Sequence, residues 1–342
     1  YLDLEKLDLR KLESGALVYS DGKKHLIGDP MRNWKVLIPT LLADIGSIGD
    51  KLKILKLNIR LKSKSLEEIF ASPEKTTQEY LVDFGFSSKI IDRFFKPFFA
   101  GIFLEPDLRT SSRMFEFVYK MFGEGYATIP KQGIGEISHQ LKGKLKQTKF
   151  IFNEPVEEVT NEEIILRSGE KKSHQGVIIA SNASALMRKM QDQDVAWKSC
   201  MCVYFEVDQT NIPNGTIALV AAPETYSNNL YAFQDELSGK TVLSVTTLQH
   251  DGKKEQEVID SITAEIKEFA ACEQATYIHH YTIAQALPDI QNLRITSQPS
   301  ESQVMENVFL AGDYLFNGSL NAAMESGRLA ALGLIEKKSQ TL

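Results

Sequence analysis

Hydrophobic and polar positions divide the chain into stretches of different period. Apolar residues recur at helical spacing from about Lys51 to Phe122 and again from Lys254 to Phe269. Between Lys198 and Thr247 they alternate with polar residues, and Pro-Asn-Gly and Ser-Gly turns separate the runs. Short apolar runs at 152–181 predict strands joined by turns, and 308–335 has the pattern of a strand and a helix. The chain is therefore predicted to combine sheets with a layer of helices.

Capping residues predict where helices begin in the first helical stretch. Ser65 followed by Glu68 has the spacing of a capping box, in which each side chain accepts a hydrogen bond from the other residue's backbone. Thr110, Ser111 or Ser112 precedes a later apolar period and is the predicted cap of that helix.

The C-terminal end carries the most informative pattern. The apolar run Val308–Leu310 leads to Gly312 and Asp313, which predicts a buried strand whose carboxyl end opens a crevice. A glycine lets another backbone or a ligand approach closely, and an aspartate accepts hydrogen bonds from ligand hydroxyls. Taken alone, the pattern fits an ordinary strand–turn–helix of an α/β domain equally well.

A helix with three alternative caps follows this turn. They are Asn317, Ser319 and Asn321, and the positive end of the helix dipole suits a phosphate or an electron-rich carbonyl in the same crevice. Small residues at helical spacing form a smooth face that can press against a strand or a cofactor: Ala323, Gly327 and Ala330.

Residues 310–335, LAGDYLFNGSLNAAMESGRLAALGLI, resemble the C-terminal FAD-binding motif of the superfamily of flavin-dependent amine oxidases, protoporphyrinogen oxidases and carotenoid (phytoene) desaturases. The resemblance implies FAD as the cofactor, with Gly312 and Asp313 at its ribityl or pyrophosphate part. It also implies that the start of the following helix lies beside the flavin ring. The helix residues implied are Ser319, Leu320, Asn321, Ala322 and Ala323.

Upstream stretches match the same superfamily. Residues 152–159 resemble its P-V-x-x-V piece, which implies that the backbone of Val156 contacts the adenine, and 177–181 resembles the strand that leads back into the FAD domain. The loop before a helix near Gln132 is similar to a P-x-G-G entry with glutamine in place of a glycine, and 283–288 resembles the A-x-P segment that precedes the C-terminal motif. Without that motif, the strands at 152–181 would favour a plain β-meander.

The N-terminal glycine motif of the superfamily is missing from this sequence. The superfamily begins with a strand, G-x-G-x-x-G and a helix, whose glycines and helix end hold the FAD pyrophosphate. Here the first piece similar to the superfamily is a hairpin at 17–26, which in the relatives follows that unit. We infer that the chain lacks the N-terminal βαβ unit, which leaves open whether the remaining half-site holds FAD.

The predicted fold class is α/β, with an α+β substrate domain. An N-terminally incomplete, Rossmann-like FAD-binding domain is expected at 130–187 and 296–342. A substrate domain of sheet and helices, at 1–129 and 188–295, is interleaved with it.

Aromatic residues concentrate between Phe84 and Tyr126. Phenylalanine pairs on both sides of Pro97 predict that a continuous helix is interrupted at the proline. A dense aromatic core between helices is the favoured interpretation. The alternative is a tunnel for a large apolar substrate taken from a membrane surface, and its lining would include Phe98, Phe99 and Phe103.

Composition narrows the remaining function classes. The net charge of −6 over 342 residues is modest and dispersed, which argues against a nucleic-acid partner. Three cysteines without a Cys-x-x-Cys pair favour a reducing, cytoplasmic compartment and argue against structural zinc. No apolar run has the length of a membrane span, so the expected membrane contact is peripheral. The six histidines form no triad or metal-ligand pattern, so the sequence identifies no catalytic side chain, no metal site and no oligomeric state.

Three functions stay open. In flavin dehydrogenation the cofactor accepts the hydride, and the protein mainly positions the substrate. In the amine oxidases of the superfamily an aromatic residue of the C-terminal motif forms one wall of a cage around the amine, whereas the corresponding position here is Ser319. This departure favours hydride transfer from a small apolar substrate. The alternatives are an amine or amino-acid oxidase that releases hydrogen peroxide, and a non-catalytic, flavin-free fragment or binding module.

Overall fold

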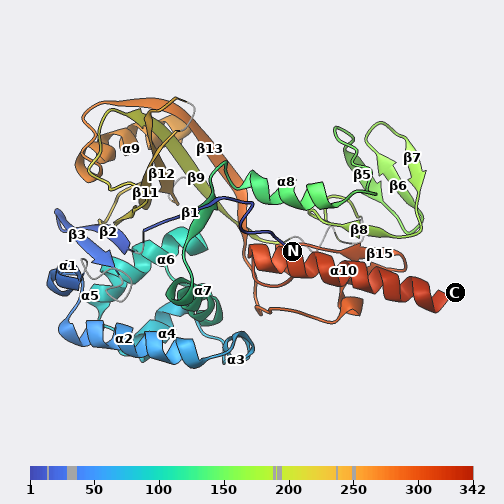
Figure 1. The fold of residues 1–342 in the computed structure, drawn as a ribbon, viewed down its shortest axis with the longest axis horizontal. Helices are drawn as coiled ribbons and strands as arrows, with labels where there is room; N and C mark the ends of the chain where they lie inside the picture. The colour runs from blue at the N-terminus through green and yellow to red at the C-terminus, as the bar shows by residue number, and fades with distance from the viewer. Residues whose placement is uncertain are drawn as a thin grey trace. The chain divides into compact units, whose positions relative to one another are not determined.

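The chain forms two compact units in a computed structural model (Figure 1). The larger unit comprises Tyr1–Leu145 and Lys198–Ala286, and the smaller unit comprises Lys146–Trp197 and Leu287–Leu342. Both contain helices and sheets, in agreement with the predicted α/β class. The bounds of these units differ from the predicted domain ranges, because 130–145 belongs to the larger unit, and 188–197 and 287–295 belong to the smaller. The structure describes residues 1–13, 15–28, 37–187, 190, 195–235, 238–248 and 252–341.

A seven-stranded sheet organises the larger unit, in the order β13-β9-β12-β11-β10-β2-β3. β2 and β10 are parallel, with Ala16 opposite Ile217, whereas the pairs β2–β3, β10–β11, β11–β12 and β12–β9 are antiparallel. The hairpin predicted at 17–26 is β2–β3. The strands are β2 (Gly15–Ser20), β3 (Lys23–Gly28), β9 (Trp197–Val207), β10 (Ile217–Val220), β11 (Asn229–Gln234), β12 (Thr241–Thr247) and β13 (Ala275–Pro288).

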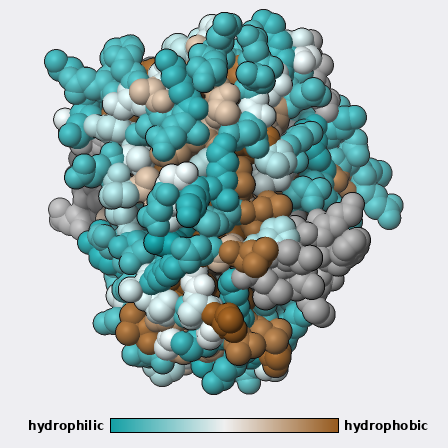
Figure 2. Space-filling view, turned by 90° about the vertical axis from the view of Figure 1, so that its left-hand side faces the viewer, coloured by the Kyte–Doolittle hydropathy of each residue, from teal (hydrophilic) through white to brown (hydrophobic). Residues whose placement is uncertain are grey.

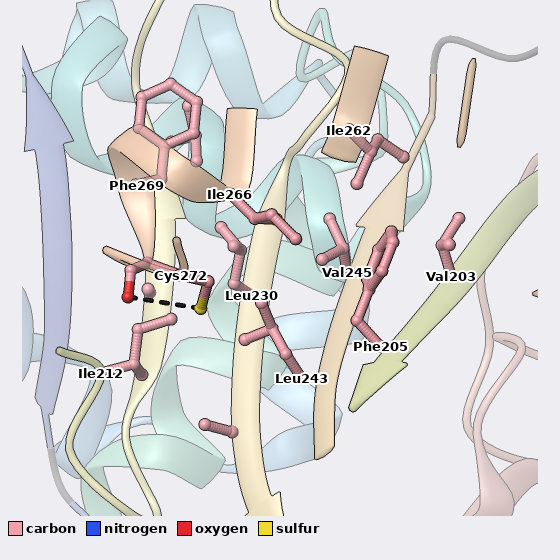
Figure 3. Close-up of a cluster of buried hydrophobic side chains, with 14 of the residues drawn as sticks. Val203, Phe205, Ile212, Leu230, Leu243, Val245, Ile262, Ile266, Phe269 and Cys272 are labelled. Atoms are coloured by element: carbon pink, nitrogen blue, oxygen red, sulfur yellow. Dashed lines mark hydrogen bonds between the residues drawn. The ribbon is translucent and has the colours of Figure 1, made fainter. Parts of the chain in front are cut away.

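Alternating side chains give this sheet two apolar faces. Leu17 and Tyr19 of β2 point to one face, where strand residues pack against α9 (Glu255–Phe269) through Ile262 and Ile266 (Figure 3). Ala16 and Val18 of the same strand point to the other face, which packs against the helical layer. The period of two along the strand therefore produces three layers: α9, the sheet and the helices.

The helical layer contains the caps that the sequence predicts. Ser65 and Glu68 form the predicted capping box. Ser111, rather than Thr110 or Ser112, caps the later helix by accepting from the Arg113 N–H. The helices are α1 (Leu37–Leu42), α2 (Ile48–Ser63), α3 (Leu66–Phe70), α4 (Thr77–Asp83), α5 (Ser88–Ile90), α6 (Lys96–Phe103) and α7 (Ser112–Glu124).

Pro97 interrupts the α-helical hydrogen bonds but not the path of the helix. A π-helical turn, η2 (Ile91–Phe95), joins α5 to α6, and the Lys96 N–H donates to the Ile91 carbonyl five residues earlier. Pro97 therefore lies in the first turn of α6, where its missing N–H is tolerated. The predicted interruption is confirmed for the bonding pattern and wrong for the continuity of the helix.

Two three-stranded sheets and a long helix build the smaller unit. β15 (Val308–Leu310) lies between β14 (Gln303–Met305) and β8 (Val177–Ile179). It is parallel to β8 and antiparallel to β14. Phe309 and Ala311 pack against α10 (Leu320–Thr341), whereas Val308 and Leu310 share a core with the second sheet. The second sheet consists of β5 (Val156–Val159), β6 (Glu163–Leu166) and β7 (Lys171–Ser173).

The remaining elements are short. β1 (Leu9–Lys11) pairs with β4 (Thr128–Pro130), and α8 (Gly135–Lys144) follows β4 as predicted for that loop and helix. Two 3-10 turns, η4 (Pro299–Ser302) and η5 (Asp313–Leu315), flank β14 and β15. Among the described residues, no helix combines the length and hydropathy needed to cross a bilayer.

Candidate functional site

The predicted glycine-acid turn lies at the carboxyl end of β15. The Ala311 N–H donates to the Ile179 carbonyl at 2.9 Å, so pairing with β8 continues to the edge of the turn. The Gly312 N–H then donates to Ser326 Oγ of α10 at 2.9 Å, and that hydroxyl donates to the Ala323 carbonyl at 2.9 Å. Ser326 therefore fixes the turn to the helix, a role that the sequence did not indicate.

The space beside Gly312 is filled by the ring of Tyr314. A Cβ added at Gly312 would lie 2.2 Å from Tyr314 Cε1. The glycine φ of 164° is extended and accessible to any residue, so glycine is required here by space rather than by backbone conformation. The neighbour on this side of Gly312 is thus a side chain of the turn itself, and the close approach of a ligand to the glycine stays a prediction.

Asp313 and Tyr314 present polar atoms that the protein leaves available. Asp313 Oδ1 accepts from the Tyr314 N–H at 2.9 Å, and among the described residues its Oδ2 has no hydrogen-bond partner. The Tyr314 hydroxyl is buried and likewise finds no partner in the described part of the chain. Burial, assisted by the Asp313 charge, raises the pKa of Tyr314. A ligand that accepts a hydrogen bond from this hydroxyl would recover a desolvation cost of about 1–3 kcal/mol.

Ser319 is the cap of α10. Its Oγ accepts from the Ala322 N–H at 3.1 Å, and its carbonyl accepts from the Ala323 N–H at 3.0 Å. Ser319 Oγ also donates to the Oδ1 of buried Asn317 at 2.7 Å, and the Asn317 amide donates to the Arg294 carbonyl at 2.8 Å. Of the three predicted alternatives, Ser319 therefore caps the helix and Asn317 positions it.

The residues around this cap differ in exposure. Leu320 and Asn321, in the first turn of α10, are exposed, whereas Ala322 is buried. Gly318 has a φ of +70°, and a Cβ added there would lie 3.3 Å from Leu287 and Pro288. The segment that resembles the A-x-P motif therefore lies against the turn that begins α10.

The small-residue face of α10 divides into a packed part and an open part. Ala330 packs against Phe309 and Ala311 of the β15 segment. At Gly327, by contrast, an added Cβ would meet no heavy atom within 4 Å. The prediction of close packing against a strand is thus confirmed at Ala330, whereas packing of Gly327 against a cofactor stays a prediction.

Val156, the predicted adenine contact, begins β5 in the same unit. A bulge lies between Val156 and Glu158 where β5 pairs with β6. The Val156 side chain packs against the core cluster that also contains Val308 and Leu310. Val156 and the glycine-acid turn are therefore built on one core.

The aromatic residues predicted as a tunnel lining lie in the larger unit. Phe99 and Phe103 are fully buried, and the Phe99 ring centroid lies 4.7 Å from that of Phe115 and 5.2 Å from that of half-buried Phe98. This packing is the aromatic core that the sequence favoured, and a role of these rings in lining a substrate tunnel stays a prediction.

The site offers polar groups that fit the cofactor implied by the sequence resemblance. The available carboxylate oxygen of Asp313 suits ribityl hydroxyls, the capped start of α10 supplies a positive dipole end, and the Tyr314 hydroxyl needs an acceptor. Within the described ranges, no group of three or more His, Cys, Asp or Glu side chains is arranged to hold a metal ion.

Solved structures share this fold at low sequence identity. An oxidoreductase from Methanosarcina mazei has a TM-score of 0.69 at 14% identity, with 96% of this chain and 81% of that chain covered. A wild-type putrescine oxidase bound to putrescine has a TM-score of 0.63 at 10% identity, with 99% and 84% covered. Cyclohexylamine oxidase from Brevibacterium oxydans has a TM-score of 0.62 at 14% identity, with 98% and 84% covered.

Sequence comparison gives the family directly. No curated protein sequence matches the chain significantly. The family model of flavin-containing amine oxidoreductases matches residues 2–335, which is nearly the whole chain. The chain therefore belongs to the flavin-containing amine oxidoreductase family and is a flavin-dependent oxidoreductase.

Proposed function

We propose that the protein binds FAD on its smaller unit and transfers a hydride from an apolar substrate to the flavin. The observation that carries the substrate class is the start of α10. Residues 317–323 contain no aromatic side chain, and at the position expected for the wall of an amine cage Ser319 is engaged as the helix cap. Leu320 beside it is 51% exposed and offers an aliphatic surface.

The Phe316 ring, three residues before Ser319, is also poorly suited to bind an amine. The Phe316 ring is buried, and the Arg294 guanidinium lies 5.8 Å from its centroid. Because that ring is already paired with a cation, it has little free face for a substrate ammonium. This arrangement supports an uncharged substrate.

The residues of the turn are proposed to bind and orient the cofactor. Asp313 Oδ2 would accept hydrogen bonds from the ribityl hydroxyls, and the Tyr314 hydroxyl would donate to an acceptor of the bound ligand. The α10 N-terminus would lie near the electron-rich carbonyl end of the ring system. Once bound, the flavin supplies the hydride acceptor.

Amine oxidation is the second candidate. Two of the similar structures are oxidases named for amines, putrescine and cyclohexylamine. Amine substrates would transfer the hydride from the carbon beside the nitrogen, and the reoxidation of flavin by oxygen would release hydrogen peroxide. The two candidates therefore share the cofactor and differ in the substrate.

Asp313→Ala is expected to weaken FAD binding by about 10- to 100-fold, since a hydrogen bond to a charged group contributes about 1.5–3 kcal/mol. Titration of the purified protein with FAD, followed by flavin fluorescence, measures this change. Glu336→Ala removes an exposed carboxylate of α10, outside the glycine-acid turn, and serves as the matched control. If both variants bind FAD like the wild type, Asp313 does not hold the cofactor.

The substrate class is tested by anaerobic bleaching of the bound flavin. Phytoene serves as the apolar probe, and putrescine and cyclohexylamine serve as amines. Bleaching by an apolar probe alone supports the proposal. Bleaching by an amine, with peroxide released on readmission of air, supports the second candidate, and a wild-type protein that binds no added FAD contradicts both.

A further inference from the structure

A row of aliphatic side chains covers the outer face of α2. Ile48, Leu52, Leu55 and Ile59 are spaced by four, three and four residues, so they lie on one face of the helix. Their exposed fractions are 78%, 64%, 52% and 64%. Hydrophobic side chains appear along the lower part of the face drawn in Figure 2, at the height of α2 in Figure 1. We refer to these four residues as the α2 stripe.

The opposite face of α2 holds the helix firmly in the larger unit. Leu57 and Leu61 are fully buried, and α2 packs against α7. Buried Asp50 accepts from Ser47 and from the N–H and hydroxyl of Ser87, which fixes the first turn to the start of α5. The helix therefore cannot rotate to bury its stripe in the core, because its core-facing side is already packed.

Basic residues flank the stripe. The sequence of α2 contains five Lys or Arg residues and one carboxylate, the buried Asp50, although the whole chain has a net charge of −6. At 100° per residue, Lys51 and Lys62 lie along one border of the stripe, and Lys56 and Arg60 lie beyond the other. A narrow aliphatic row between cations is the pattern of a helix that lies in the interface of an anionic membrane.

A cationic pocket opens beside the same helix. Its volume is about 430 Å³, and Lys56, Arg60, Lys64 and Lys75 contribute to its lining. Lys64 pairs with Glu116 at 2.5 Å and Lys75 with Asp83 at 2.7 Å. These are the two acids of the lining, so the pocket retains an excess of two positive charges.

The two remaining cations share one aromatic ring. The Lys56 Nζ and the Arg60 guanidinium lie 5.8 Å and 6.0 Å from the Phe84 ring centroid. Neither forms an ion pair within the described part of the chain. The ring keeps both side chains on the pocket side of α2, where an anionic headgroup would meet them.

We propose that α2 docks the protein on an anionic phospholipid surface, with the α2 stripe among the acyl chains and a lipid phosphate in the cationic pocket. Charge complementarity decides between this occupant and a second copy of the chain. Two copies facing each other through α2 would oppose their basic borders and repel, whereas anionic lipids neutralise the same residues. The inference is independent of the substrate proposed above.

Vesicle flotation of the whole protein tests the docking. The protein is expected to float with phosphatidylcholine vesicles that contain phosphatidylserine, to float far less with phosphatidylcholine alone, and to be released by salt. The double variant Leu52→Gln and Leu55→Gln is expected to lower the partition by at least about tenfold. Its matched control is Ile335→Gln with Leu145→Gln, which changes residues of similar exposure, 60% and 50%, against 64% and 52% in the stripe.

A second double variant, with its own control, tests the role of the cationic pocket. Lys56→Gln with Arg60→Gln is expected to reduce flotation on phosphatidylserine vesicles by about tenfold. Lys146→Gln with Lys149→Gln makes the same change of net charge at exposed positions elsewhere and is expected to leave flotation unchanged. Each variant is expected to be folded, because the changes are at surface positions, and circular dichroism checks this.

Three results would overturn the proposal. The first is a wild type that does not float on phosphatidylserine vesicles, or floats equally on both kinds. The second is a stripe or pocket variant that is folded and floats like the wild type. The third is a native mass that falls from dimer to monomer in the stripe variant, since the occupant of α2 would then be a second copy of the chain.

Discussion

Phe99→Ala is expected to lower the free energy of unfolding of the larger unit by about 4 kcal/mol, the cost of removing a fully buried phenylalanine from a packed core. The Phe99 side chain has no exposed surface. Its ring lies within 6.4 Å of the ring centroids of Phe95, Phe98, Phe103 and Phe115. Because these neighbours are themselves held by other rings, they cannot collapse fully into the space that alanine would leave. Urea unfolding followed by near-ultraviolet circular dichroism measures the loss.

The same variant separates an aromatic core from a substrate tunnel. Phe122→Ala is the control, since that ring is 42% exposed and its replacement is expected to cost much less. A loss below about 1 kcal/mol for Phe99→Ala would mean that the ring borders a space already open to a ligand. That result would favour a substrate tunnel over a packed aromatic core.

Asp50→Asn is expected to cost about 3 kcal/mol at neutral pH. Burial alone would raise the pKa of Asp50, but hydrogen bonds from Ser87 and Ser47 outweigh it and lower the pKa from 3.8 to about 2. This shift contributes about 2 kcal/mol of stability to the ionised, folded state. Asp50 Oδ2 accepts from the Ser47 N–H and from the hydroxyls of Ser47 and Ser87, and Asp50 Oδ1 accepts from the Ser87 N–H. The NH₂ group of an asparagine would therefore face a backbone N–H donor in either orientation.

The direction of the pKa shift determines how the stability difference between wild type and Asp50→Asn changes with pH. The folded-state pKa of Asp50 lies below its ordinary value, so its contribution is complete above about pH 4 and is lost as the pH falls towards 2. The difference in stability between wild type and Asp50→Asn should therefore narrow over this range in urea titrations. Asp83→Asn, at an exposed ion pair with Lys75, should change stability by less than about 1 kcal/mol. Parallel pH profiles for wild type and Asp50→Asn would contradict the assignment.

Local signals in the sequence predicted local structure well. Ser65 and Glu68 lie three residues apart, so their mutual hydrogen bonds depend on nothing beyond one helical turn. The strand at Val308–Leu310 and the helix after it were predictable for the same reason, because their patterns are short and uninterrupted. Ser47 and Asp50 have the same capping spacing and could have been identified from it.

Contacts between distant residues were not predictable from one sequence. The Ser87 bonds to Asp50, the Ser326 bond to Gly312 and the Asn317 bond to the Arg294 carbonyl join residues that only the fold brings together. The continuous path through Pro97 depends on the π-helical turn before it, which has no local residue signature. The candidate flavin residues were found through resemblance. The Tyr314 hydroxyl, which is buried and has no partner among the described residues, became visible only in three dimensions.

The parallel pairing of β2 with β10 has a consequence for synthesis of the chain. Ala16 pairs opposite Ile217, so about 200 residues must leave the ribosome before the two strands can meet. Until then the backbone edge of β2 that later pairs with β10 is unpaired, and an unpaired edge is a template for wrong pairing with other strands. Folding of the larger unit is therefore expected to finish late, and a nascent chain halted before β10 should need a chaperone to stay unaggregated.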